Sequence, residues 1–146
     1  MSEPIKVFVT GLESSGTQWV SSMLSQHPGL IVQHGSCPSD GGPYRHYVQL
    51  PKDHVVVIVV RDKSCQEASV KRRGYNDTTP DKFSFEENIG CLSIYIDAAP
   101  KTVFVSYETL VMWKQKYLNQ VFHQLGVESI TVTTEWRDEN SKYRVQ

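Results

Sequence analysis

The chain has 146 residues, of which 39% are hydrophobic and 21% are charged, and its formal net charge is −1. This length suits one domain with a single core, and the composition is that of an ordinary soluble globular protein. The nearly balanced charge excludes a broad electrostatic attraction to nucleic acid or to a membrane surface.

The first third of the chain alternates a predicted strand, a helix and a second strand. A run rich in β-branched residues predicts a short buried strand over residues 5–10. Apolar residues at positions i, i+1, i+4 and i+5 then predict a helix over residues 18–26, and residues 30–33 form a second short strand. The stretch 34–46 is rich in Gly, Pro and Ser and forms a long loop, which in a compact domain tends to be functional or disordered.

The middle of the chain contains its strongest strand signal. Residues 54–60 (HVVVIVV) form a nearly continuous apolar run, typical of a central parallel strand that is covered on both faces. A turn and a polar helix follow over residues 61–73, then a loop over residues 74–81 and a helix over residues 83–98 with its apolar residues on one side.

The last part of the chain supplies one more strand and one more helix. Residues 101–106 (KTVFVS) predict a fourth strand, and residues 117–125 predict an amphipathic helix. Gly126 closes that helix, because glycine is common just past a helix end. Residues 130–146 are mostly polar and carry no clear periodicity.

Strands and helices therefore alternate along the chain. This pattern predicts an α/β fold, a three-layer P-loop-like domain with a central, mostly parallel sheet flanked by helices, formed by residues 1–146 as a single domain. Ligands of such sheets bind beyond the carboxyl ends of the strands. The segments after residues 10, 33 and 60 all follow predicted strands, so we expect them to form one site.

The segment TGLESSGTQW, residues 10–19, has the glycine spacing of a phosphate-binding loop. Gly11 and Gly16 match the two glycines of G-x-x-x-x-G-K-S/T, but Thr17 stands at the lysine position. Backbone N–H groups at a glycine-rich turn and helix N-terminus still form an anion site, and Ser15 and Thr17 add hydroxyl donors.

The same segment resembles a known enzyme family. S-G-T-x-W at a strand-to-helix turn, followed by L-x-x-H-P at the end of the helix, is similar to sulfotransferases that use 3′-phosphoadenosine-5′-phosphosulfate (PAPS). The matching residues are Ser15, Gly16, Thr17, Trp19, Leu24, His27 and Pro28. The resemblance implies that the turn binds the 5′-phosphosulfate, that Trp19 lies against the adenine and that no metal is needed. It assigns donor binding at this turn to Ser14, Ser15, Gly16, Thr17, Gln18 and Trp19.

A second signature of that family is an arginine at the end of a central strand with a serine eight residues later, both on the 3′-phosphate. Here the valine-rich strand runs into Arg61, and Ser69 stands eight residues on. Arginine suits this role because its fork of donors stays charged and matches phosphate oxygens. Residues 103–110 (VFVSYETL) also resemble the family's strand ending in Y-E-D-L, which implies structural roles for Tyr107 and Glu108.

The chain departs from the family at one position. Most cytosolic members carry a lysine immediately before S-G-T, and Ser14 stands there instead. A cation in such a site contributes on the order of 10²–10³ in rate, so either another cation replaces it, or the protein is slow, or it only binds. The candidates for the replacement are Lys71, Arg72, Arg73, Lys142 and Arg144.

Sulfuryl transfer also needs a base that removes the proton of the acceptor. The resemblance places His34 in this role at the end of the second strand, and a histidine imidazole can accept a proton near neutral pH. Glu13 is the competing base, because some carbohydrate sulfotransferases use a glutamate. We expect no role for His46, His54 and His123.

The resulting prediction is an enzyme that transfers a sulfuryl group from PAPS to a hydroxyl, or an amine, of a small molecule or glycan, leaving 3′,5′-adenosine bisphosphate. Residues 35–50 and 74–84 would shape the acceptor pocket, with Tyr44, Arg45 and Tyr47 as candidates. A non-catalytic nucleotide- or anion-binding module of the same fold and a P-loop nucleotide kinase stay open as alternatives. No nucleic-acid or membrane partner is expected.

Cysteine usage and the N-terminus bear on the compartment. Cys37, Cys65 and Cys91 are isolated, without the C-x-x-C spacing of a zinc or redox motif. An odd cysteine count without a signal peptide favours a reducing environment, and no stretch approaches the roughly 20 apolar residues of a membrane span. The sequence therefore predicts a cytoplasmic protein.

Overall fold

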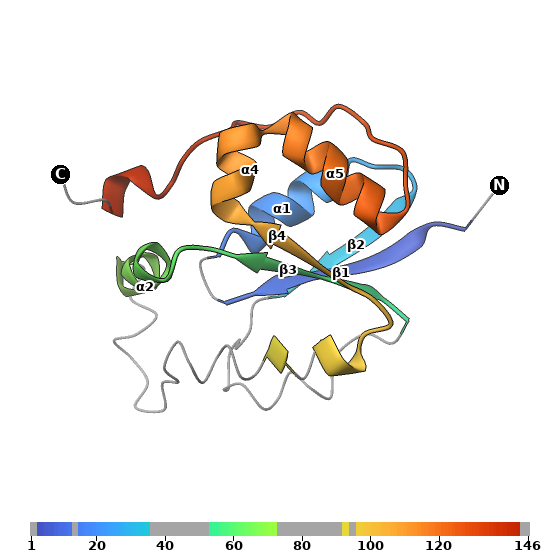
Figure 1. Ribbon diagram of the computed structural model, residues 1–146, viewed down its shortest axis with the longest axis horizontal. Helices are drawn as coiled ribbons and strands as arrows, with labels where there is room; N and C mark the ends of the chain where they lie inside the picture. The colour runs from blue at the N-terminus through green and yellow to red at the C-terminus, as the bar shows by residue number, and fades with distance from the viewer. Residues whose placement is uncertain (1–2, 13–14, 36–52, 73–91, 94–95, 144–146) are drawn as a thin grey trace.

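The computed structural model describes residues 3–12, 15–35, 53–72, 92–93 and 96–143 (Figure 1). In chain order the elements are β1 (Ile5–Gly11), α1 (Thr17–Leu24), β2 (Leu30–His34), β3 (Val55–Val60), α2 (Lys63–Arg72), β4 (Thr102–Ser106), α4 (Tyr107–Trp113), α5 (Gln115–Leu125) and the 3₁₀ turn η3 (Ser141–Tyr143).

The four strands form one parallel sheet in the order β2-β1-β3-β4. Its register pairs Val9 with His34 on one side and with Val57 on the other. The predicted α/β class is therefore correct, and each predicted strand agrees with the observed one to within a residue at either end. Because all four strands run the same way, their carboxyl ends share one edge of the sheet.

Both faces of the sheet carry helical residues, as the sequence of β3 predicts. The helices α1, α4 and α5 cover one face, where Val7, Val57 and Phe122 belong to the main buried core (Figure 1). On the other face Leu92 packs with Ile58 in a smaller cluster. The valine run of β3 is buried from Val56 to Val59, because it lies between these two clusters.

One helix, α4, was not predicted from the sequence. Helix α4 begins directly where β4 ends, because the Ser106 hydroxyl accepts a hydrogen bond from the backbone N–H of Thr109 (3.1 Å) and caps it. Lys114, with a φ of 54°, separates α4 from α5. Most of the predicted helix 83–98, and most of the two predicted loops, lie outside the described residues.

The polar tail after α5 is tied to the first helix rather than free. The Gln26 side chain makes two hydrogen bonds to the backbone of Thr133 (2.8 and 2.9 Å), and the Trp19 indole donates to Thr134 (2.8 Å). The tail then continues to η3, which lies beside α2 (Figure 1). These contacts bring the end of the chain to the carboxyl edge of the sheet. None of the described helices has the length and apolarity needed to cross a bilayer.

Candidate functional site

Two glycines shape the turn between β1 and α1. A Cβ on Gly11 would lie 2.6 Å from the carbonyl oxygen of Val59, so only glycine allows β1 and β3 to approach here. Gly16 has a φ of 93° and caps α1, and a Cβ there would lie 3.0 Å from the ring of Tyr107. The glycine spacing noted in the sequence therefore sets the path of the turn and the start of α1.

A cavity of about 980 Å³ opens beside this turn at the carboxyl edge of the sheet. Its described lining residues are Gly16, Thr17, Gln18, Trp19, Ser22, His34, Arg61, Ser69, Arg72, Tyr107, Thr134, Glu135, Arg137, Glu139, Lys142 and Tyr143. The structure thus brings the turn, the end of β2 and the segment after β3 to one cavity. We call the part at Gly16 to Trp19 the turn end, and the part at Ser69 and Arg72 the α2 end.

Arg61 also lines the cavity, and its partners include the tail residue Asn140 and the ring of Tyr107. Its Nε donates to Oδ1 of Asn140 (2.6 Å), and its guanidinium carbon lies 4.8 Å from the ring centroid of Tyr107. Asn140 is itself fixed, because its amide donates to Glu108 (2.5 Å), which also accepts the backbone N–H of Asp62 (3.1 Å). This chain of contacts orients the guanidinium at the carboxyl edge of the sheet.

Tyr107 lines the cavity, and its hydroxyl is hydrogen bonded to the backbone of the tail. The side chain is buried, and its hydroxyl accepts the backbone N–H of Glu139 (2.9 Å) and donates to the carbonyl of Arg137 (3.5 Å). Burial raises the pKa of Tyr107 above its ordinary value, against the opposing effects of the Glu139 hydrogen bond and the Arg61 charge. The phenol therefore stays neutral at physiological pH.

At the α2 end a tail tyrosine meets two predicted site residues. Tyr143 lines the cavity together with the buried Ser69 and with Arg72. Burial acts to raise the pKa of Tyr143, but its interactions with Ser69, Lys142 and Arg72 outweigh it and lower the pKa. This end of the cavity therefore favours negative charge.

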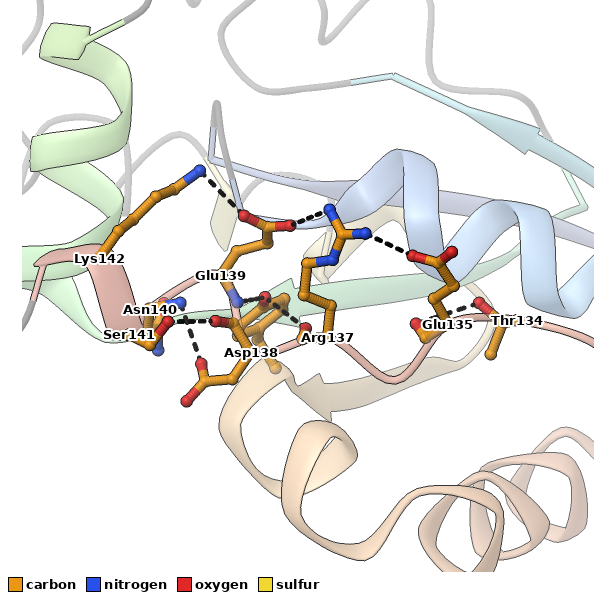
Figure 2. A network of polar contacts seen from close by, with 9 residues as sticks. Thr134, Glu135, Arg137, Asp138, Glu139, Asn140, Ser141 and Lys142 are labelled. Atoms are coloured by element: carbon orange, nitrogen blue, oxygen red, sulfur yellow. Dashed lines mark hydrogen bonds and ion pairs between the residues drawn. The ribbon is translucent and has the colours of Figure 1, made fainter.

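Four charged tail residues form a ladder along the cavity (Figure 2). Lys142 pairs with Glu139 (2.9 Å), Glu139 lies 3.7 Å from Arg137, and Arg137 pairs with Glu135 (2.6 Å). The hydrogen bond with Lys142 lowers the pKa of Glu139, burial opposes this, and the nearby cations lower it further. Glu139 is thus an internal counter-ion shared by two cations that line the cavity.

Trp19 both packs and lines the cavity. Its ring packs edge to face against those of Tyr107 and Trp136, with centroid distances of 5.6 Å and 5.9 Å respectively. Its indole N–H donates a hydrogen bond to the Thr134 hydroxyl. Contact of this ring with an adenine stays a prediction.

The other predicted site residues separate into those that line the cavity and those that do not. His34 ends β2, is exposed and lines the cavity, whereas Ser15 is buried and is not part of the described lining. Glu13, Ser14, Tyr44, Arg45, His46 and Tyr47 lie outside the described residues. His54 is buried, His123 is exposed on α5, and neither belongs to the lining.

The candidates for a replacement cation separate in the same way. Arg72 and Lys142 line the cavity, and Lys71 is exposed outside the lining. Arg73 and Arg144 lie outside the described residues. Sequence reasoning gave Tyr107 a structural role only and named no site role for Glu135, Arg137, Glu139 or Tyr143. The sequence of the tail has no hydrophobic periodicity from which its position at the edge of the sheet could have been predicted.

Comparisons with known proteins give distant structural likenesses only. No protein-family model matches the chain, and no curated protein matches it. Among solved structures, mouse sulfotransferase SULT7A1 complexed with PAP is similar with 13% sequence identity and a TM-score of 0.48, over 97% of this chain and 63% of that chain. The chain thus spans less than two thirds of the length of that sulfotransferase chain.

Proposed function

We propose that this chain is a sulfotransferase that moves a sulfuryl group from PAPS to a hydroxyl or amine of a small molecule or glycan. One observation carries the proposal: the turn at Gly16, the strand-end Arg61 and Ser69 line a single cavity, although they are distant in sequence. That is the arrangement a ligand with two separate anionic groups requires.

The cavity fits such a donor in size and charge. Its volume of about 980 Å³ is at the upper end of ordinary ligand pockets, which span roughly 300–1,000 Å³. Among the described lining residues, four basic side chains stand against two carboxylates. Arg61 and Ser69 would hold the 3′-phosphate at the α2 end, and the N–H groups that begin α1 would hold the 5′-phosphosulfate.

His34 would take the acceptor's proton. The donor supplies an activated sulfuryl group, and the acceptor oxygen or nitrogen forms the new bond to sulfur as the bond from sulfur to the 5′-phosphate oxygen breaks. His34 is exposed at the mouth of the cavity, at the end of β2, where an acceptor can reach it.

Binding and turnover test the proposal separately. Calorimetry should show that 3′,5′-adenosine bisphosphate binds at least about 10-fold more tightly than 5′-AMP, and that Arg61→Ala removes the difference. Sulfate transfer from labelled PAPS to a panel of phenols, alcohols and sugars should be lost in His34→Ala and kept in the control His123→Ala. Equal affinity for the two nucleotides would overturn the assignment.

A non-catalytic nucleotide-binding module is the second candidate, because Ser14 replaces the lysine that usually precedes the turn. That reading predicts tight binding of the bisphosphate with no transfer to any acceptor. A P-loop kinase is disfavoured, because the first carboxylate after β3, Asp62, accepts the backbone N–H of Cys65 (2.9 Å) as a helix cap. Magnesium-dependent ATP turnover that Thr17→Ala abolishes would revive it.

A further inference from the structure

The turn end of the cavity needs a cation from elsewhere in the chain. Its described residues from Gly16 to Trp19 carry no charge, so a phosphosulfate there would meet only backbone and hydroxyl donors. The described basic residues of the lining are Arg61, Arg72, Arg137 and Lys142. Their positions decide which of them can serve this end.

Three of these cations serve other parts of the cavity. Arg72 ends α2, and Lys142 belongs to η3, which packs beside α2. Arg61 is held by the buried Asn140 and by the ring of Tyr107, and the proposed function assigns its guanidinium to the 3′-phosphate.

Arg137 lies at the turn end. The ring of Tyr107 approaches Gly16, where a Cβ would lie 3.0 Å from it, and the hydroxyl of the same tyrosine donates to the carbonyl of Arg137. The residue before it, Trp136, packs against Trp19 with centroids 5.9 Å apart. Figure 2 shows the guanidinium of Arg137 on the α1 side of the ladder, opposite the end where Lys142 lies.

The present partners of Arg137 can be exchanged. Its pair with Glu135 joins side chains that are 67% and 78% exposed, and such exposed pairs contribute little to stability. Glu139 is a longer contact at 3.7 Å. A phosphate group with two or more oxygens offers the guanidinium a forked, charge-assisted pair, which is the stronger interaction.

We propose that Arg137 supplies the cation that the turn lacks and binds the 5′-anionic group of the ligand, giving up Glu135 and Glu139 to do so. This rests on the proposed function. When sulfur bonds to the acceptor and its bond to the 5′-phosphate oxygen breaks, the electron pair stays on that phosphate, and Arg137 stabilises the charge.

Mononucleotides separate the two ends of the cavity without any need for turnover. The 146-residue chain and its Arg137→Ala, Arg137→Gln and Arg72→Ala variants are titrated by calorimetry with 3′,5′-adenosine bisphosphate, 5′-AMP and 3′-AMP. Both Arg137 variants should bind 5′-AMP and the bisphosphate about 10- to 100-fold more weakly and leave 3′-AMP within about twofold. Arg72→Ala should show the opposite preference. Arg137 is exposed, so circular dichroism should show both variants folded.

The outcomes distinguish the inference from the function beneath it. If wild type prefers the bisphosphate over both mononucleotides but the Arg137 variants bind 5′-AMP normally, the role of Arg137 is wrong and the proposed function stands. An equal loss for 5′-AMP and 3′-AMP also overturns the role, because it indicates a general effect on the tail. If wild type binds the bisphosphate no more tightly than the mononucleotides, both the role of Arg137 and the proposed function are wrong.

Discussion

Truncation of Asn140 to alanine tests whether the tail holds Arg61 in place. The Asn140 side chain is 1% exposed and joins two charged groups, accepting from Arg61 (2.6 Å) and donating to Glu108 (2.5 Å). The substitution Asn140→Ala removes both hydrogen bonds and keeps the backbone. It should therefore loosen the attachment of the tail and free the guanidinium at the same time.

The structure sets the size of both effects. A hydrogen bond to a charged group contributes about 1.5–3 kcal/mol, and water can replace part of it here because Arg61 and Glu108 are only partly buried. We expect the free energy of unfolding to fall by about 2–3 kcal/mol, which lowers Tm by about 4–12 °C in a domain of this size. Restoring freedom to one ordered side chain should weaken binding of the bisphosphate about 2- to 12-fold.

Thermal unfolding by circular dichroism and calorimetry of the bisphosphate measure the two effects. Gln120→Ala, which truncates an exposed amide on α5, is the matched control and should change stability by less than about 0.5 kcal/mol. Asn140→Asp keeps an acceptor for Arg61 but sets a carboxylate against Glu108, so its stability should recover as the pH falls. A Tm for Asn140→Ala within about 1 °C of wild type would refute the reasoning.

Three further predictions concern the turn, the tail and the core. Gly16→Ala should cost about 1–2 kcal/mol for its left-handed backbone and more for the contact with Tyr107, seen as a lower Tm and lost bisphosphate binding. Since the pKa of Glu139 is lowered from 4.5 by Lys142, its contribution is present above that value and lost as the pH falls below it. Unfolding midpoints from pH 6 down to 3 should therefore show a component that Glu139→Gln lacks, and identical profiles would contradict the Lys142 pair. Phe122→Ala should lower stability by about 3–5 kcal/mol in chemical denaturation, because that ring is fully buried between α5 and the sheet.

The sequence alone determined the parts of this protein that depend on local patterns. The valine run of β3, the glycines at positions 11 and 16 and the glycine that ends α5 each act through short-range geometry, so their strands, turn and helix end could be predicted. The pairing of Arg61 and Ser69 was implied by the resemblance to the sulfotransferases, and both residues line one cavity. Helix α4 was not predicted, because its capping serine, Ser106, is also the last residue of β4.

Only the tertiary structure decided what the tail does. Its attachment depends on side-chain contacts over long separations, such as that of Trp19 with Thr134 and that of Arg61 with Asn140. Such contacts leave no period in the sequence, because each partner reads locally as an ordinary polar or aromatic residue. Folding the chain brings them together at the edge of the sheet, where the tail adds two cations and two carboxylates to the lining of the cavity.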